Sequence, residues 1–182
     1  MASGDLPRYR GYLALLARRC VDRQLRRKLD SSDLVQNTLL RIAASGEVFW
    51  QLSDAERLPY LNRCLRNELF DQRRRFFGEK RNVALERSLD DVIDESSARL
   101  TDWLAAGTAS PSDQAIKSEM LLLLADAVVS LPPEQREAFE LKHLQGLTLQ
   151  ETADAMGKQT IAQVAGLLRR ATKTLRQAAA DP

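Results

Sequence analysis

Basic, amide and aromatic side chains recur on one face of the segment from Tyr60 to Phe77. At helical spacing this face carries Arg63, Arg66, Asn67, Phe70, Arg73 and Arg74. Guanidinium groups neutralise phosphates and position a nucleic acid without reading its sequence. An amide or a ring among them can hold an unstacked base. The face predicts nucleic-acid contact, although in isolation it fits equally well the solvated side of an amphipathic helix that packs through Leu61, Leu65 and Leu69.

A second basic set follows a helix–turn–helix pattern nearer the C-terminus. Thr148 and Glu151 form a capping-box pattern, which marks the start of one helix. Thr160 and Gln163 form another after the break at Gly157. The second helix carries Gln163, Arg169, Arg170 and Lys173. Because helix–turn–helix proteins place their second helix in the major groove, these residues are candidates for DNA contact.

A polar stripe runs along the segment from Asp33 to Ile42. Its members are Asp33, Gln36, Asn37 and Arg41, opposite Leu34, Val35, Leu39 and Ile42. Such side chains can bind a protein partner. A stripe of this kind is more often plain solvated surface, so on its own it does not indicate a binding site.

Helical periodicity dominates the elements that must position these faces. No sustained period-two alternation indicates strands. A first helix is expected from the apolar stripe over residues 9–20, and a second after Ser31 or Ser32 as N-cap. A third is expected from Ser53, where Glu56 completes a capping box. We therefore predict an all-α fold.

Charge alternates in blocks along the chain, although the net charge is only +2. Residues 63–81 hold seven Lys or Arg against three acids, and residues 84–119 hold eight acids against three basic residues. We predict two small helical domains, residues 1–82 and 112–182, joined by an acidic linker over residues 83–111. Trp103 in that linker could dock on a neighbouring domain, but we favour a role in capping a short local helix.

Several classes of site are not expected. Cys20 and Cys64 lie far apart, with no CxxC motif and no histidine nearby, so we expect buried free thiols and neither a metal nor another cofactor. No nucleophile–base pair or phosphate-binding glycine loop indicates an enzyme. The chain shows no signal-peptide pattern and no apolar run near eighteen residues, so we expect a cytoplasmic protein without membrane contact.

The order of these three faces along the chain, with the acidic segment between the second and third, resembles that of the sigma factors, the specificity subunits of bacterial RNA polymerase. Segment DLVQNTLLRI is similar to their second conserved region, in which an Asp-x-x-Gln face binds the clamp helices of the largest polymerase subunit. Asp33 and Gln36 match, whereas Asn37 stands where an acid is common. The resemblance implies that Asp33, Gln36, Asn37 and Arg41 contact core polymerase.

Segment YLNRCLRNELFDQRRRFF resembles the part of the same region that melts and reads the −10 element. Asn67, Asp71 and the arginines that follow match its Asn-x-x-x-Asp-x-x-Arg pattern. Tyr60 replaces a Trp that is usual before the Leu. The resemblance implies that the basic face of this segment binds the −10 element.

Segment LPPEQREAFELKHLQGLTLQETADAMG is similar to the fourth conserved region, which docks on the polymerase flap and reads the −35 element. VAGLLRRATKTLR resembles its recognition helix. The turn KQTIAQ is one residue longer than usual, and Ala165 and Gly166 stand where many relatives carry a basic residue and a serine. Base reading would then rest on Gln163, Arg169 and Arg170.

The resemblance covers residues 8–178, and nothing corresponds to the first and third conserved regions of large sigma factors. It implies an extracytoplasmic-function (ECF) sigma factor of the sigma-70 family, which binds core RNA polymerase and promoter DNA, helps to open the −10 duplex and can have an anti-sigma factor as a further partner. The rival interpretation is an autonomous helix–turn–helix regulator with an N-terminal interaction domain. An anti-sigma or polymerase-sequestering protein is disfavoured by the two basic DNA-facing surfaces.

Overall fold

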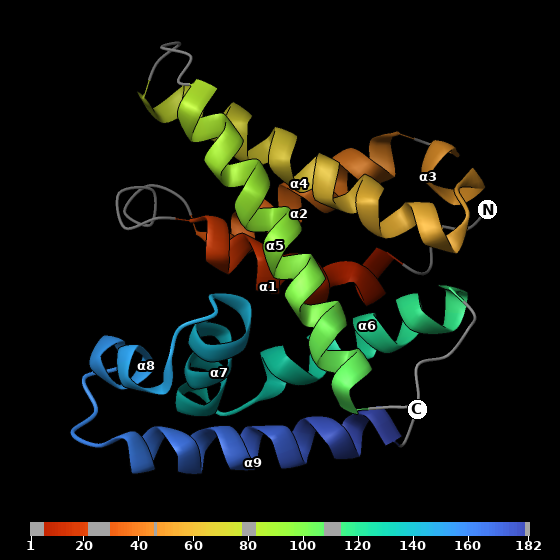
Figure 1. Ribbon diagram of the computed structural model, residues 1–182. Coiled ribbons are helices and arrows are strands. Elements are labelled where there is room, and N and C mark those ends of the chain that lie inside the picture. Colours follow the sequence, from red (N-terminus) through yellow and green to blue (C-terminus); the bar gives the residue numbers. More distant parts are fainter. Residues whose placement is uncertain (1–5, 22–29, 46, 78–82, 108–113, 181–182) are drawn as a thin grey trace.

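The described part of the chain is built from helices alone (Figure 1). The computed structural model describes residues 6–21, 30–45, 47–77, 83–107 and 114–180. The N-terminal elements are η1 (Leu6–Tyr9), α1 (Arg10–Cys20), α2 (Ser31–Ala44), α3 (Val48–Gln51) and α4 (Asp54–Phe77). The later ones are α5 (Val83–Gly107), α6 (Gln114–Ser130), α7 (Pro133–Phe139), the π-helical segment η3 (Glu140–Leu144), α8 (Leu149–Ala155) and α9 (Ile161–Ala180). The predicted all-α fold is confirmed.

Local capping explains several helix starts. The N-cap of α2 is Asp30, whose carboxylate accepts from the Ser32 backbone N–H at 2.9 Å. The helix therefore begins one residue earlier than an N-cap at Ser31 would imply, and two residues earlier than an N-cap at Ser32. At α4 the Ser53 backbone N–H donates to Glu56 at 3.0 Å, which is one half of the predicted capping box, and the Ser53 hydroxyl donates to the same carboxylate at 2.6 Å.

The N-terminal helices pack around Tyr12 of α1. Its ring is fully buried, and its hydroxyl lies 2.9 Å from both Asn62 of α4 and Ser97 of α5. Phe49 of α3 is equally buried and meets the ring of Tyr9 edge-on at 5.3 Å. A hydroxyl with two partners can be buried without a large desolvation penalty, so Tyr12 ties three helices together.

Helix α5, Val83–Gly107, occupies most of the segment that was predicted as a linker over residues 83–111. Figure 1 shows it running across the molecule, from beside α4 to the level of α6. Ile93, Leu100 and Leu104 are buried at a spacing of seven and then four residues, which is one face of a helix. The exposed acids on its other faces make the composition resemble a linker, but the apolar face holds the segment in the core.

Trp103 docks on the C-terminal half of the chain and does not cap a local helix. Its ring meets Phe139 edge-on at 5.3 Å and His143 at 6.2 Å. The docking alternative for this residue is therefore the right one, and the interpretation that we favoured is wrong.

Helices α1 and α6 cross closely enough to exclude a side chain at Gly11. A Cβ atom there would overlap the carboxylate of Asp126 and lie 3.0 Å from its Cα. The Gly11 backbone N–H donates to that carboxylate, so Asp126 satisfies a group in the first turn of α1. Arg18 of α1 also pairs with the largely buried Glu140, with Nε 2.9 Å from Oε1.

One apolar core consequently runs from the N-terminal helices to α9. Its buried members include Leu16, Leu65, Leu100, Leu124 and Leu175. The chain thus crosses the predicted domain boundary without a break in packing between the described helices. The assignment of separate functions to residues 1–82 and 112–182 stays a prediction.

Candidate nucleic-acid and partner interfaces

The helix–turn–helix begins with a complete capping box at α8. Thr148 Oγ1 accepts from the Glu151 backbone N–H at 3.2 Å, and the Glu151 carboxylate accepts from the Thr148 N–H at 2.8 Å. Gly157 follows with φ 63°, in the left-handed region that glycine adopts without strain. Val164 and Leu167 of α9 pack on Ala153 of α8 in a small second core. The predicted motif is therefore present, and this core fixes which side of α9 faces solvent.

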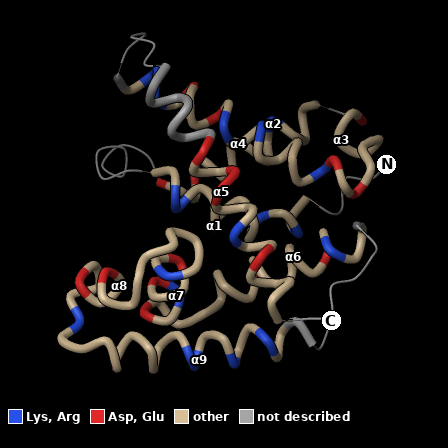
Figure 2. The backbone as a smooth tube through the Cα atoms, in the orientation of Figure 1, with Lys and Arg blue, Asp and Glu red and all other residues tan. Residues whose placement is uncertain are grey.

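Helix α9 presents the candidate DNA-contacting side chains to solvent. Arg169, Arg170 and Lys173 are exposed, on the side away from the buried Leu168 and Ala171. Figure 2 shows basic positions spaced along this helix at the edge of the molecule. Exposed guanidinium and ammonium groups on a helix of this motif can bind phosphates and base edges.

Gln163 is exposed, but its side chain also caps α9. Its Oε1 accepts from the backbone N–H groups of Gln159 at 3.2 Å and Thr160 at 3.4 Å. A base contact would have to compete with these bonds or use the amide nitrogen. At Gly166, an added Cβ would meet only Arg170 Nη1, at 3.6 Å, so packing does not require glycine there.

Helix α4 holds the predicted basic face on one continuous element. Arg63, Asn67 and Arg74 are exposed, whereas Phe70 and Arg73 are partly buried. The guanidinium of Arg63 lies 5.0 Å from the centroid of the Tyr60 ring. That contact resembles a cation–π pair and orients the arginine along the helix surface.

Arg66 is not a simple member of this face. Its Nη2 lies 3.2 Å from Asp94 Oδ1 on α5, and its side chain is only 22% exposed. Helix α5 therefore forms an ion pair with one of the arginines that the sequence predicted to contact nucleic acid. A phosphate would have to displace Asp94 to use this group.

The polar stripe of α2 is mostly open. Asp33 and Gln36 are exposed and Asn37 is partly buried. Arg41, predicted as a fourth member of the set, turns towards α4 and pairs with Glu68 and Asp71. The stripe also contains Leu40, 58% exposed, which the sequence motifs did not indicate. Its position four residues after Gln36 was the available signal, because residues i and i+4 share a helix face.

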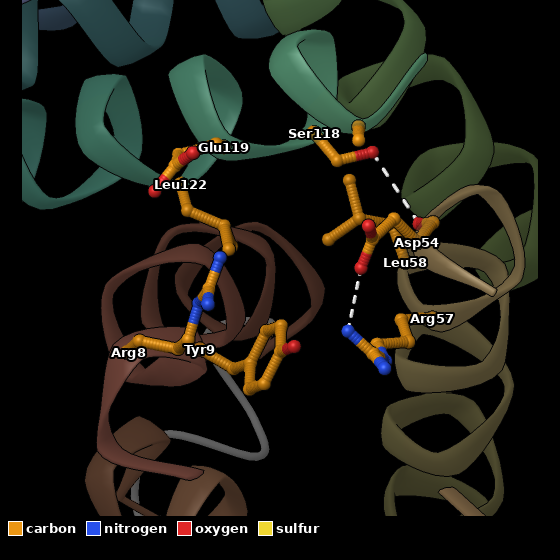
Figure 3. A pocket seen from close by; sticks show the side chains of 9 residues that line it. Arg8, Tyr9, Asp54, Arg57, Leu58, Ser118, Glu119 and Leu122 are labelled. Carbon is orange, nitrogen blue, oxygen red and sulfur yellow. Dashed lines mark hydrogen bonds and ion pairs between the residues drawn. The ribbon is translucent and has the colours of Figure 1, made fainter. Parts of the chain in front are cut away.

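A cavity of about 160 Å³ lies between η1, α4 and α6, away from these three faces (Figure 3). Arg57 in its wall pairs with Asp54 at 2.5 Å, and the Ser118 hydroxyl donates to the Asp54 carbonyl at 3.4 Å. The polar groups drawn there join α4 to α6. The cavity is thus part of the packing between the two halves of the chain.

The two cysteines are free and protonated at neutral pH. Burial raises the pKa of Cys20 to about 12, and burial likewise raises the pKa of Cys64. Within the described ranges, no group of three His, Cys, Asp or Glu residues could hold a metal ion. No helix in the described ranges has the length and apolar character to cross a bilayer.

Comparisons with known proteins point to the same family as the sequence motifs. Residues 121–178 match the family described as sigma-70, region 4. Over 66 residues the chain is 44% identical to the ECF RNA polymerase sigma factor BldN of Streptomyces coelicolor. That match covers 36% of this chain and 25% of BldN, so the matched part spans about a quarter of the relative's length. No solved structure matches the chain. Residues 121–178 are thus similar to sigma-70 region 4, and the resemblance to ECF sigma factors that the motifs indicate is supported over this part of the chain.

Proposed function

We propose that the protein is an RNA polymerase sigma factor that binds core polymerase, recognises −35 and −10 promoter elements and promotes melting of the DNA. The observation that carries the proposal is the region 4 match, which falls on a helix–turn–helix with exposed basic side chains on α9. Two further exposed faces, on α2 and α4, lie where the resemblance puts polymerase and −10 contacts.

Helix α9 is the proposed reader of the −35 duplex. Arg169, Arg170 and Lys173 supply phosphate and base-edge contacts, and Gln163 lies at the N-terminal end of the same helix. A small domain with so few base-reading groups should bind free DNA weakly and with a steep dependence on salt. Specific recruitment then depends on polymerase holding the domain over the promoter.

Helix α4 is the proposed site of −10 contact. Unstacking a base costs a few kcal/mol, about the amount that several phosphate contacts and one stacked base return. Asn67 lies between Arg63 and Arg74 on the exposed side of the helix, with Phe70 beside it. We assign Asn67 to a displaced base and the arginines to the strand that carries it.

The polymerase contact is proposed on α2. Asp33 and Gln36 give charged and amide hydrogen bonds, and Leu40 gives an apolar centre that a partner would bury. Apolar anchors surrounded by polar groups are the usual form of a protein interface.

Binding both promoter elements at once requires the two halves to separate. Elements at −35 and −10 lie about 25 base pairs apart, which is roughly 85 Å of B-form DNA. A compact chain of 182 residues has a radius of gyration of about 16 Å and so measures about 40 Å across. The packing of α1 on α6, with Arg18 paired to Glu140, is therefore proposed to open in the promoter complex.

Transcription in vitro tests the proposal. The protein should co-elute with purified core polymerase of its own organism and direct specific transcripts from a promoter upstream in that genome. Core polymerase alone is the control. Tight sequence-specific binding to DNA at physiological salt without polymerase, and no transcript, would favour the autonomous helix–turn–helix regulator instead.

A further inference from the structure

The proposed polymerase face and the proposed DNA face meet at Arg41. This residue follows Asn37 by one helical turn on α2. Its Nη1 donates to Glu68 Oε2 at 2.9 Å and to Asp71 Oδ2 at 2.7 Å, both on α4. The guanidinium thus points from the polymerase-facing helix to the DNA-facing helix, although the sequence assigned it to polymerase.

Asp71 lies inside the face that would meet DNA. It follows Asn67 by one helical turn, and its other carboxylate oxygen lies 3.6 Å from Arg74 Nη2. A carboxylate there repels phosphates unless a cation offsets its charge. The hydrogen bond to Asp71, ahead of the one to Glu68, raises the pKa of Arg41 and so favours the charged guanidinium.

Glu68 anchors the other side of the contact. Its side chain is only 8% exposed, and its second oxygen accepts from Gln72 Nε2 at 2.7 Å. A largely buried carboxylate held by two donors has little freedom to move. Arg41 therefore fixes the rotation of α4 against α2 as well as offsetting the charge of Asp71.

We propose that Arg41 is a positioning residue that aligns the DNA-facing side of α4 with the polymerase-facing side of α2 and keeps Asp71 from repelling the promoter strand. This inference rests on the proposed function of the two faces. It gives Arg41 a role through Glu68 and Asp71, without a direct contact to polymerase or to a base.

The first test compares Arg41→Met in the holoenzyme with Arg10→Met, which removes the same charge from an exposed position on α1. We expect Arg41→Met to keep core affinity within about twofold, since the Asp33 and Gln36 contacts remain. Permanganate reactivity of −10 thymines should fall roughly fivefold to tenfold, the scale of one lost charge pair near phosphates. Arg10→Met should leave both measurements unchanged, and circular dichroism should be the same for all three proteins.

Two more variants separate positioning from folding. Arg41→Lys should restore part of the −10 opening, because an ammonium group offsets charge without spanning both carboxylates. Arg41→Met combined with Asp71→Asn should recover at least about threefold of the loss, since the repelling charge is gone.

Three results would separate the role of Arg41 from the proposed function of the protein. Core binding weakened as much by Arg41→Met as by Asp33→Ala would make Arg41 a direct polymerase contact and overturn the inference. No recovery in the Asp71→Asn combination would overturn it as well. A wild-type protein that fails to bind core polymerase would instead remove the proposed function, which is a different result from a failed rescue in a working holoenzyme.

Discussion

Substitution of Leu100 measures how much the packing of α5 stabilises the fold. Its side chain is fully buried in the middle of a segment whose acidic composition is that of a linker. Replacing a fully buried leucine by alanine removes apolar burial and leaves a cavity, at a cost of about 3 kcal/mol or more. For a chain of this size we therefore expect the melting temperature of Leu100→Ala to fall by roughly 6–12 °C.

Asp102→Ala is the matched control, because Asp102 is exposed on the same helix two residues later. We expect it to change the free energy of unfolding by less than about 0.5 kcal/mol. Urea unfolding followed by circular dichroism measures both, and the continuous core predicts a single cooperative transition. A Leu100→Ala protein as stable as Asp102→Ala, or two separate transitions in the wild type, would refute the packing of α5 between the halves.

Three further results are expected. Gly11→Ala should destabilise the fold by about 1–3 kcal/mol because its Cβ would overlap Asp126, whereas Gly166→Ala should stabilise it by up to about 1 kcal/mol because only Arg170 is near. Chemical denaturation measures both free energies of unfolding, and two changes of the same sign would contradict the close crossing of α1 and α6. Burial raises the pKa of Cys20 to about 12, above an unfolded value of about 8.5, so its contribution to stability is complete below pH ~8.5 and is lost as the pH rises towards 12. The free energy of unfolding of the wild type should therefore fall faster above pH ~9 than that of Cys20→Ala. Parallel curves for the two proteins would show that the thiol is not desolvated. Arg169→Ala or Arg170→Ala should weaken closed-complex binding in band-shift assays, and a premelted template should restore activity. Asn67→Ala should leave closed complexes unchanged and reduce the permanganate reactivity of −10 thymines. Normal melting by Asn67→Ala would show that the base-reading site does not lie on α4.

Local signals in the sequence predicted the helix–turn–helix well. The capping box of Thr148 and Glu151 and the glycine at 157 act within a few residues, so their pattern survives folding unchanged. The predicted start of α2 lies one or two residues too late because Asp30, Ser31 and Ser32 can each cap a helix, and only the backbone geometry selects Asp30.

Contacts between distant segments were beyond the sequence patterns. Exposed acids lie between the apolar residues of α5, so the sequence pattern did not identify Ile93, Leu100 and Leu104 as a buried face. The partners of Arg41 lie 27 and 30 residues away, and that of Arg66 lies 28 away. Periodicity shows which face of a helix a side chain occupies, but it does not identify the charged residue on another helix that pairs with it.

The exposed face of α2 is proposed to bind core polymerase, and the core affinity of one double variant measures this contact most directly. Asp33→Ala with Gln36→Ala removes two exposed polar groups that the fold does not use in its core. Glu47→Ala with Gln51→Ala removes one acid and one amide from exposed positions around α3 and is the control.

Titration of labelled protein with core polymerase should show binding weakened by about 1–3 kcal/mol for the first pair, the usual loss for hydrogen bonds of charged groups, and unchanged for the control. Both proteins should keep the helical circular dichroism of the wild type. Wild-type affinity for core polymerase in the Asp33→Ala, Gln36→Ala protein would contradict the proposed polymerase face and, with it, the assignment of a sigma-factor role to the N-terminal half.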